Sequence, residues 1–518
     1  MKTNNLIFGA VMSTILAVGV GGQAMALDIG EEDYNLKLLG KYGFFDKISN
    51  PPRMACVTCH DPATGGTGSV SGVNLHQVAI TGANPHTVGS LKPPTNLYAA
   101  LIKPFAPCGR GGLGANNKCG GNFWDGRAEG RPDVVGFPGA LFPDGATRHI
   151  GEEVFYTTNG AQLQNVSQYA DYFGPTADQA LNPMPNIVEQ NIERKAVCEH
   201  VKSAKYAELY ELAWGVPIDC SEDEVTVQAA DVTSLGAPSE KAYDISFKRY
   251  ILAICAWQHS KELNSFSSKR DKALQRELDG TDPDPTPGKF PLVGFTPKEN
   301  LGHDLFYNTR PNPFGNPANP LNQPPRPDLP VTNCSFCHLT DLSKPDGTGL
   351  LERYSDDAYH NIGTPANPEL PAAPNPGIRG HIGNIVNPGF FKVPTMRNVD
   401  KRKGKGFIKA YTHNGYFKSL ESILHFYNTS AIANPAAAGN QFDTANSFGV
   451  VKCESLGIQQ ATEKQALANN CWPAPEWPGA SAVLVGNLHL TAEQEAAIVA
   501  YLKTFTDTET VKAPAPYK

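Results

Sequence analysis

Two copies of the pattern Cys-x-x-Cys-His constrain this chain more than any other feature of its sequence. The residues that form them are Cys56, Cys59 and His60 in the first copy, and Cys334, Cys337 and His338 in the second. This pattern is the attachment site of c-type haem, because the two thiols add to the haem vinyl groups and the adjacent imidazole can then bind the iron. The sequence therefore predicts two covalently bound haem c groups and a fold that encloses both.

The first 26 residues have the form of a signal peptide. Lys2 precedes an apolar run over about residues 6–20, and Ala24-Met25-Ala26 has the small-x-small pattern of a cleavage site. The run is short for a membrane span, and no later stretch is long and apolar enough to cross a bilayer. We therefore expect a periplasmic protein that is exported by a cleavable signal peptide, begins near Leu27 and does not span the membrane.

Charge and cysteine content narrow the partners and the compartment. The chain has 518 residues and a formal charge of −7, which argues against nucleic acid and anionic membrane surfaces as partners. Outside the haem motifs, neighbouring cysteines could close short loops as disulfides in an oxidising compartment, although the sequence does not fix the pairing. These neighbours are Cys108 and Cys119, Cys198 and Cys220, and Cys453 and Cys471. Cys255 lies in an apolar run and is expected to be a buried free thiol.

The pattern of apolar residues predicts a mainly α fold with long irregular loops. Helical periodicity runs over residues 31–46, 187–213 and 241–264. Capping-box sequences at Thr296 and Thr491 start two further helices. Strand signal is weak, and Gly- and Pro-rich stretches predict loops.

The chain also shows signs of an internal duplication. A short amphipathic helix precedes each haem motif, with Leu39-Gly40 in the first and Leu301-Gly302 in the second. A Pro- and Asp-rich stretch at residues 279–288 separates the halves. We expect two c-type cytochrome-like domains in tandem, residues 27–285 and 286–518, after a signal peptide at 1–26.

The ligand opposite each motif histidine decides what each haem can do, because an occupied position favours electron transfer and a displaceable one permits peroxide chemistry. For the first haem, His76 and His86 are the candidates, and either could equally be an ordinary loop histidine. For the second haem, Met396 and His413 are plausible ligands. Tyr427 lies on the apolar side of a predicted helix, where periodicity alone makes it a core residue.

Trp124 is a candidate for electron transfer between the two cofactors. It lies in a Gly-containing loop, where Phe123 precedes it and Asp125 and Arg127 follow it. A tryptophan in such a loop is usually a packing residue, but here it could also be held between the haems.

Several segments, taken together and in order, resemble the bacterial di-haem cytochrome c peroxidases and the related MauG proteins. These segments are Leu39-Gly40, Phe44-Phe45-Asp46, Phe123–Ala128, Asp178–Ala180, Tyr359–Gly363, Val393–Asn398 and Tyr411–Gly415. The resemblance implies that His60 is the proximal ligand of a peroxidatic haem and that His76 is its displaceable distal ligand. It also implies that Trp124 lies between the haems and that His338 binds the haem that relays electrons.

Three departures from the family pattern bear on function. Tyr427 stands where ordinary family peroxidases have a methionine ligand, which is the MauG-like choice and stabilises ferric and higher iron states. Pro185 stands where the family's distal glutamate is expected, so the proton shuttle would fall to His76, to Glu189, to a carboxylate within residues 131–170, or to no residue at all. Lys92 stands where the family has an asparagine that binds an interdomain calcium ion, which makes calcium doubtful.

The sequence thus favours a periplasmic di-haem peroxidase that reduces hydrogen peroxide with electrons from a small c-type cytochrome or cupredoxin. A MauG-like enzyme that oxidises Trp or Tyr residues of a partner protein is the alternative, and Tyr427 favours it. A non-enzymatic di-haem electron carrier is the third possibility.

Overall fold

Helices and irregular loops make up most of the structure, and its strands are short. A computed structural model describes residues 33–108, 117–130, 169, 172, 174–226, 239–278, 291–308, 326, 328–338, 352–430, 449–478 and 485–517. The helices are α1 Tyr34–Phe45, α2 Cys56–Cys59, α3 Ser71–Leu75, α4 Pro175–Ala180, α5 Arg194–Ser203, α6 Glu208–Trp214, α7 Ala242–Gln258, α8 Lys269–Leu278, α9 Pro297–Tyr307, α10 Cys334–Cys337, α11 Arg379–Ile382, α12 Leu420–Thr429, α13 Glu463–Ala468 and α14 Ala492–Lys503. The mainly α prediction is confirmed.

Within the described part of the chain, the strands form four two-stranded pairs with two or three residues per strand. The antiparallel pairs are β1 Ala106–Pro107 with β2 Lys118–Cys119, β3 Glu224–Thr226 with β4 Ser239–Lys241, and β5 Tyr359–His360 with β6 Phe391–Lys392. The pair β7 Val451–Lys452 with β8 Cys471–Trp472 is parallel. These short pairs connect loops to one another, and within the described residues they do not join into a larger sheet.

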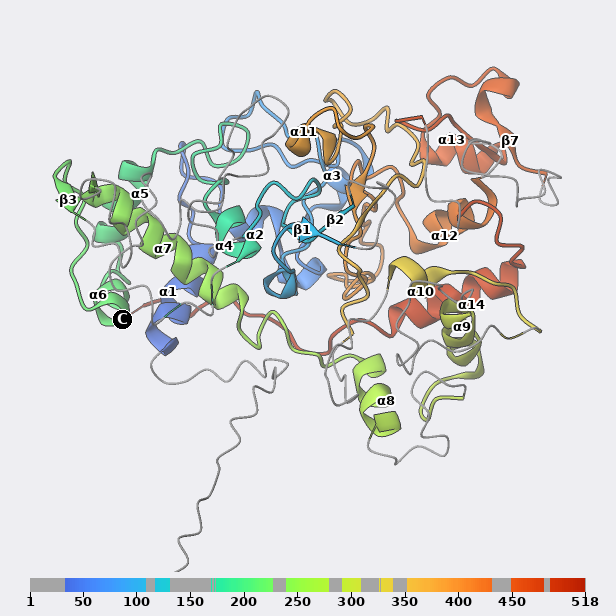
Figure 1. The fold of residues 1–518 in the computed structure, drawn as a ribbon, viewed down its shortest axis with the longest axis horizontal. Coiled ribbons are helices and arrows are strands. Elements are labelled where there is room, and N and C mark those ends of the chain that lie inside the picture. Colours follow the sequence, from blue (N-terminus) through green and yellow to red (C-terminus); the bar gives the residue numbers. More distant parts are fainter. Residues whose placement is uncertain are drawn as a thin grey trace, which may run out of the picture.

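A helix precedes each haem motif, α1 before the first and α9 before the second, and each crosses another helix at a glycine. Helix α1 packs on α7, and α9 packs on α14 (Figure 1). A Cβ atom at Gly40 would lie 1.8 Å from the carbonyl oxygen of Ala253, and one at Gly302 would lie 2.0 Å from that of Ala497. The glycines of the two predicted Leu-Gly pairs therefore have the same structural role, because only glycine lets the crossing helices approach so closely.

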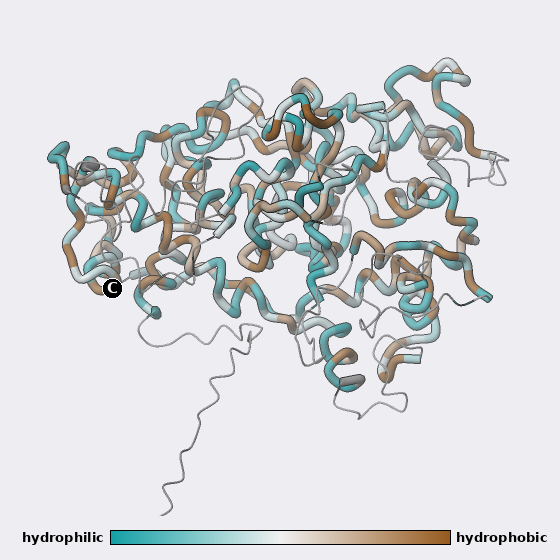
Figure 2. Tube along the Cα trace, viewed as in Figure 1, coloured by the Kyte–Doolittle hydropathy of each residue, from teal (hydrophilic) through white to brown (hydrophobic). Residues whose placement is uncertain are grey.

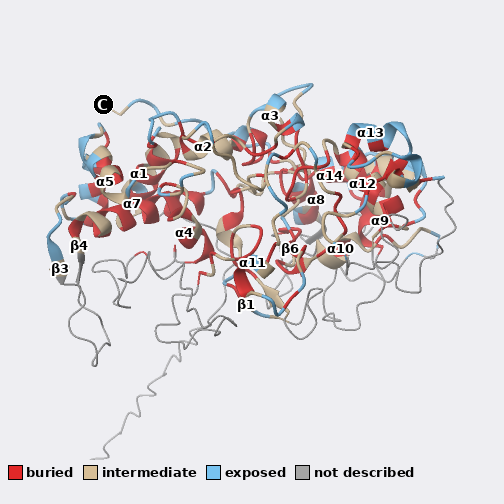
Figure 3. Ribbon diagram, turned by 90° about the horizontal axis from the view of Figure 1, so that it is seen from above, coloured by how far each residue is buried: buried red, intermediate tan, exposed pale blue. Residues whose placement is uncertain are grey.

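The two largest hydrophobic clusters of the described residues lie in the two halves of the chain. In the first, α7 is buried over most of its length (Figure 3), and Trp257 packs on Phe44 of α1 with ring centroids 4.8 Å apart. In the second, Phe306 of α9 packs on Tyr501 of α14 with centroids 5.5 Å apart. Each core supports the helix that leads to its own haem motif.

The two halves also exchange segments. Helix α8 lies against the C-terminal half, where Arg270 forms a buried ion pair with Glu352. In the other direction, the C-terminal segment returns to the N-terminal half and ends near α6 (Figure 1), where Tyr42 donates a hydrogen bond to the carbonyl of Ala515 at 2.7 Å. The predicted domain boundary at residues 279–288 lies outside the described residues.

Several local predictions are confirmed by the structure. Both capping boxes form, at Thr296 with Glu299 and at Thr491 with Gln494. The three neighbouring cysteine pairs are disulfides, and Cys255 is a buried free thiol. The stretch 187–213 is not one helix, because residues 187–193 form turns and α5 and α6 follow as separate helices.

The described helices are too short or too polar to cross a bilayer, and hydrophilic and hydrophobic segments alternate along them (Figure 2). The predicted signal peptide, residues 1–26, lies outside the described residues.

The close crossing of α9 and α14 predicts that Gly302→Ala destabilises the protein. In an open helix, alanine is favoured over glycine by up to about 1 kcal/mol, but at Gly302 the added methyl must displace backbone atoms, which costs about 1–3 kcal/mol. Gly72→Ala in α3 is the matched control, because its Cβ would meet nothing within 4 Å. Thermal unfolding should show a lower midpoint for Gly302→Ala and an unchanged or slightly higher one for Gly72→Ala. An unchanged midpoint for Gly302→Ala would mean that the helices do not cross this closely.

Candidate haem sites

The two Cys-x-x-Cys-His motifs have the same local structure. Each is a single helical turn, α2 or α10, with the histidine at its C-terminal end. All four motif cysteines are free thiols, whereas the three other neighbouring pairs are disulfides. The motif thiols are thus available for attachment to haem vinyl groups.

Backbone carbonyls orient both motif histidines. Nδ1 of His60 lies 2.9 Å from the carbonyl oxygen of Pro94 and 3.2 Å from that of Gly66, and Nδ1 of His338 lies 2.9 Å from that of Tyr354. A hydrogen bond from Nδ1–H to a carbonyl fixes the tautomer and leaves Nε2 for a metal. Burial lowers the pKa of both histidines, which favours the neutral, metal-binding imidazole.

The second motif opens into a mainly apolar cavity of about 510 Å³. Cys334, Cys337 and His338 line it, and the chain brings Tyr427, Met396 and His413 to the same cavity. The volume lies in the range of cofactor sites. The residues therefore fit a haem, and all three candidate ligands of the second haem reach its site.

Of these candidates, His413 is engaged elsewhere. Its Nε2 lies 2.6 Å from a carboxylate oxygen of Glu476, and its ring stacks on Phe391 with centroids 3.5 Å apart. The Tyr427 hydroxyl has no hydrogen-bond partner among the described residues, and burial raises its pKa. A phenol in this setting needs a cation to stabilise its anionic form.

The first motif lines a second cavity together with residues from α4, from α7 and from the loop between α4 and α5. Gln179, Glu189 and Gln258 face this cavity beside His60. The side-chain oxygens of Gln258, Asn96 and Gln190 are buried without a partner among the described residues. These unsatisfied polar atoms fit a cavity that takes a polar ligand.

Pro185 occupies the position where the resemblance implies a glutamate, but the carboxylate of Glu189 lines the first cavity. Pro185 is exposed, whereas Glu189 lines the cavity and accepts a hydrogen bond from the Asn186 amide at 2.8 Å. Burial raises the pKa of Glu189, and Arg127 opposes that increase. Sequence reasoning named Glu189 as one alternative only, since nothing in an irregular loop shows which side chain turns inward.

His76 and His86 lie outside this cavity. His76 ends the short helix α3, its side chain is 68% exposed, and its Nδ1 lies 3.3 Å from a carboxylate oxygen of Glu369. His86 is also exposed. Neither histidine lines the cavity that contains His60 within the described part of the chain.

Trp124 lies at the second cavity and is connected to the first site through the segment that contains Lys92 and Pro94. Its side chain is buried at the edge of the second cavity, 6.4 Å from the ring of His413 between centroids. Its Nε1 donates a hydrogen bond of 2.8 Å to the carbonyl oxygen of Lys92. Because Pro94, two residues further on, accepts the hydrogen bond from His60, a short covalent and hydrogen-bonded path joins the two sites through Trp124.

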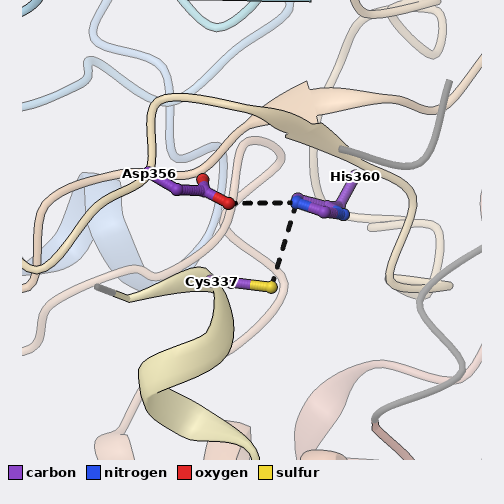
Figure 4. Close-up of side chains that lie close together, drawn as sticks. All are labelled: Cys337, Asp356 and His360. Atoms are coloured by element: carbon purple, nitrogen blue, oxygen red, sulfur yellow. Dashed lines mark hydrogen bonds and ion pairs between the residues drawn. The ribbon is translucent and has the colours of Figure 1, made fainter. Parts of the chain in front are cut away.

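Cys337, Asp356 and His360 form a cluster next to the second motif (Figure 4). Nε2 of His360 lies 3.8 Å from Sγ of Cys337 and 3.5 Å from a carboxylate oxygen of Asp356. Burial alone would lower the pKa of His360, but Cys337 and Asp356 raise it to about 10. Attachment of Cys337 to a haem vinyl group would turn its thiol into a thioether, so this cluster belongs to the second haem site and is not a separate metal site.

The residues near Lys92 do not fit a calcium ion. Calcium takes six to eight oxygen ligands, commonly including carboxylates. The Lys92 side chain is buried, and its ammonium lies 3.1 Å from the carbonyl of Pro93 and 5.8 Å from the centroid of the Trp124 ring. A buried positive charge at this position repels a divalent cation.

Comparison with known proteins connects this arrangement to one family. Residues 35–279 match the family described as di-haem cytochrome c peroxidase. The methylamine utilization protein MauG of Paracoccus denitrificans (strain Pd 1222) is 25% identical over 439 residues, which is 82% of each chain.

Two solved structures share the fold. The diheme peroxidase BthA from Burkholderia thailandensis E264 is 19% identical with a TM-score of 0.54, and the match covers 92% of this chain and 87% of that one. A Tyr-to-Met variant of the same protein matches with 18% identity, a TM-score of 0.54, and coverage of 92% and 86%.

Proposed function

We propose that the chain is a periplasmic oxidoreductase that reduces hydrogen peroxide, supported by its match to the di-haem cytochrome c peroxidase family over residues 35–279 and by its similarity to MauG. Peroxide binds at the site of His60, and electrons come from a small c-type cytochrome or cupredoxin. The observation that carries this proposal is the Glu189 carboxylate in the cavity that contains His60.

Each motif holds one haem c through its two cysteines and its histidine. When bound, the haems supply the iron centre that takes up peroxide and the redox centre that passes electrons. The chain's own contribution begins with the carbonyls of Pro94 and Tyr354, which hold His60 and His338 with Nε2 toward the cavities. Free motif thiols next to these histidines support covalent attachment at both sites.

Glu189 moves the proton that peroxide cleavage requires. Heterolytic cleavage needs one group to take the proton from the near oxygen and return it to the leaving oxygen. A partly buried carboxylate with a raised pKa serves both steps, because its pKa is closer to the operating pH. Gln179, which faces the same cavity, can hold the peroxide by a hydrogen bond.

Trp124 connects the two sites. The indole is held by the Lys92 carbonyl on one side and lies against His413 on the other. An electron that enters at the second site reaches the first through this buried ring.

Tyr427 favours a second candidate function, the oxidation of Trp or Tyr residues on a partner protein. Tyr427 would hold the second haem together with His338, because both line the cavity of the second motif and the Tyr427 hydroxyl has no other partner in the described residues. An anionic oxygen ligand stabilises oxidised iron, which suits an enzyme that stores oxidising equivalents and passes them to a protein substrate. A non-enzymatic electron carrier needs no carboxylate that transfers protons, so Glu189 in the first cavity argues against that function.

Replacement of Glu189 tests the peroxidase proposal. Glu189→Gln keeps the size of the side chain but removes the proton shuttle, and kcat/KM for peroxide should fall by about 10²–10⁴-fold. The measurement is steady-state oxidation of a reduced small c-type cytochrome by hydrogen peroxide.

Glu369→Gln is the control for this experiment, because Glu369 faces His76 away from the cavity. It should leave turnover unchanged. Equal losses in both variants would remove Glu189 from the mechanism. A wild-type protein that oxidises no small redox donor in any reduction state would contradict the peroxidase function and leave the protein-oxidising one.

Replacement of Trp124 tests the route between the sites. Trp124→Phe should slow electron transfer from the second site to the first by at least about tenfold, because phenylalanine is harder to oxidise and loses the hydrogen bond to Lys92. Stopped-flow spectroscopy of the half-reduced protein after mixing with peroxide measures this rate. Trp477→Phe is the control, because Trp477 also lines the second cavity but donates its indole hydrogen bond to the carbonyl of Asn375 and not to the segment that leads to the first site. Equal rates in the two variants would exclude Trp124 from the route.

A further inference from the structure

The side chain of Lys409 ends in a cage of backbone carbonyls. Its Nζ donates hydrogen bonds to the carbonyl oxygens of Thr64 at 2.9 Å, Asn398 at 3.1 Å and Lys401 at 3.2 Å. An ammonium group has three N–H donors, and each of them meets one acceptor here. Lys409 is 4% exposed, so water does not compete for these donors.

The three carbonyls come from both halves of the chain. Thr64 lies in the loop that follows the first haem motif, and in the same loop the carbonyl of Gly66 accepts a hydrogen bond from His60. Asn398 and Lys401 follow Met396, which lines the cavity of the second motif. The Lys409 ammonium therefore ties the loop that orients His60 to the wall of the other site.

The loop and the wall approach each other closely at this point. Gly65 has a φ of +74°, and a Cβ atom there would lie 2.6 Å from the carbonyl oxygen of Asn398 and 3.1 Å from Nζ of Lys409. Any side chain at this position would separate the segments that the ammonium joins.

The groups around Lys409 act on the charge of its side chain in opposite directions. Burial and the neighbouring charge of Lys92 lower the pKa of Lys409 well below its usual value, and the charge of Asp400 acts in the opposite direction. The three carbonyl oxygens favour the charged ammonium, because each accepts a hydrogen bond from it. The carboxylate of Asp400 is within electrostatic reach but pairs with Arg402. Among the described residues, the one group of His, Cys, Asp and Glu side chains arranged to share a metal ion lies elsewhere, beside the second motif.

We propose that the Lys409 ammonium is the resident cation at the junction of the two haem sites and takes the place of a bound metal ion there. A lysine that supplies its own charge needs no ion from solution. Lys92, whose buried ammonium lies nearby, keeps divalent cations out. The interdomain calcium that the family resemblance implies is therefore replaced in this chain by a covalently attached cation.

Calcium removal from the wild-type di-haem protein is the first test. The protein is dialysed against a chelator, and calcium chloride is then added back. The visible spectrum and the midpoint of thermal unfolding should stay unchanged at each step, and elemental analysis should find no stoichiometric calcium. A loss of stability or a spectral change that calcium reverses would overturn the proposal.

Replacement of Lys409 is the second test. Lys409→Met keeps most of the side-chain volume but removes one donor from all three carbonyls. The Thr64 and Asn398 carbonyls keep a second donor, from the Thr67 hydroxyl and the Lys401 amide, whereas the Lys401 carbonyl is left without one among the described residues. The midpoint of thermal unfolding should therefore fall by about 4–8 °C. Lys403→Met is the matched control, because Lys403 also bridges to the first-motif loop, through an ion pair of 2.6 Å with Asp61, but its side chain is 43% exposed. Exposed pairs of this kind contribute little, so the control should unfold close to the wild type.

Equal midpoints for the two variants would contradict the role of Lys409. If Lys409→Met does not yield a folded di-haem protein, Lys409→Gln, which retains two N–H donors, should fall between Lys409→Met and the wild type in yield and unfold below the wild type. A Lys409→Gln protein as stable as the wild type would overturn the proposal, and the calcium test decides independently of either variant.

Discussion

The hydrogen bond from His60 to the carbonyl of Pro94 is the interaction on which the relation between the two sites depends. The residues just before Pro94 make the other connections. The backbone of Lys92 donates to the carbonyl of His413 at 2.7 Å and accepts from the Trp124 indole at 2.8 Å. One short extended segment thus sets the orientation of the first-site histidine, the position of the tryptophan and the distance to the wall of the second cavity. Any movement of this segment changes all three together.

The duplication supplies two similar scaffolds, and the loops make them unequal. Both motif helices follow a helix that crosses its partner at a glycine, and both motif histidines donate to a backbone carbonyl. The cavities differ in what faces the histidine. The first contains Glu189 and unsatisfied amide oxygens, whereas the second is large and mainly apolar and contains the Tyr427 hydroxyl. For this reason we assign proton-dependent peroxide chemistry to the first site and electron relay to the second.

The features that could be predicted from the sequence are those with a local physical cause. The capping boxes at Thr296 and Thr491 and the short-range disulfides each depend on residues close together in the chain, and the structure confirms them. The motif cysteines have the same local cause, and they are free thiols in the structure. The inward position of Glu189 and the carbonyl cage around Lys409 could not be predicted. Both lie in irregular segments without periodicity, where tertiary packing alone decides which side chain is buried. Pro185 indicated that the first cavity lacks a carboxylate, but Glu189, four residues further on, lines that cavity.

The central claim is that the two haem sites differ in whether an external ligand can reach the iron. His76 lies outside the first cavity, whereas Tyr427 reaches into the second. The most direct measurement is the stoichiometry of cyanide binding to the fully ferric protein, followed by absorption spectroscopy. The account predicts one cyanide per chain in the wild type and two in Tyr427→Phe. A wild-type protein that binds two or none, or a Tyr427→Phe protein that still binds one, would contradict it.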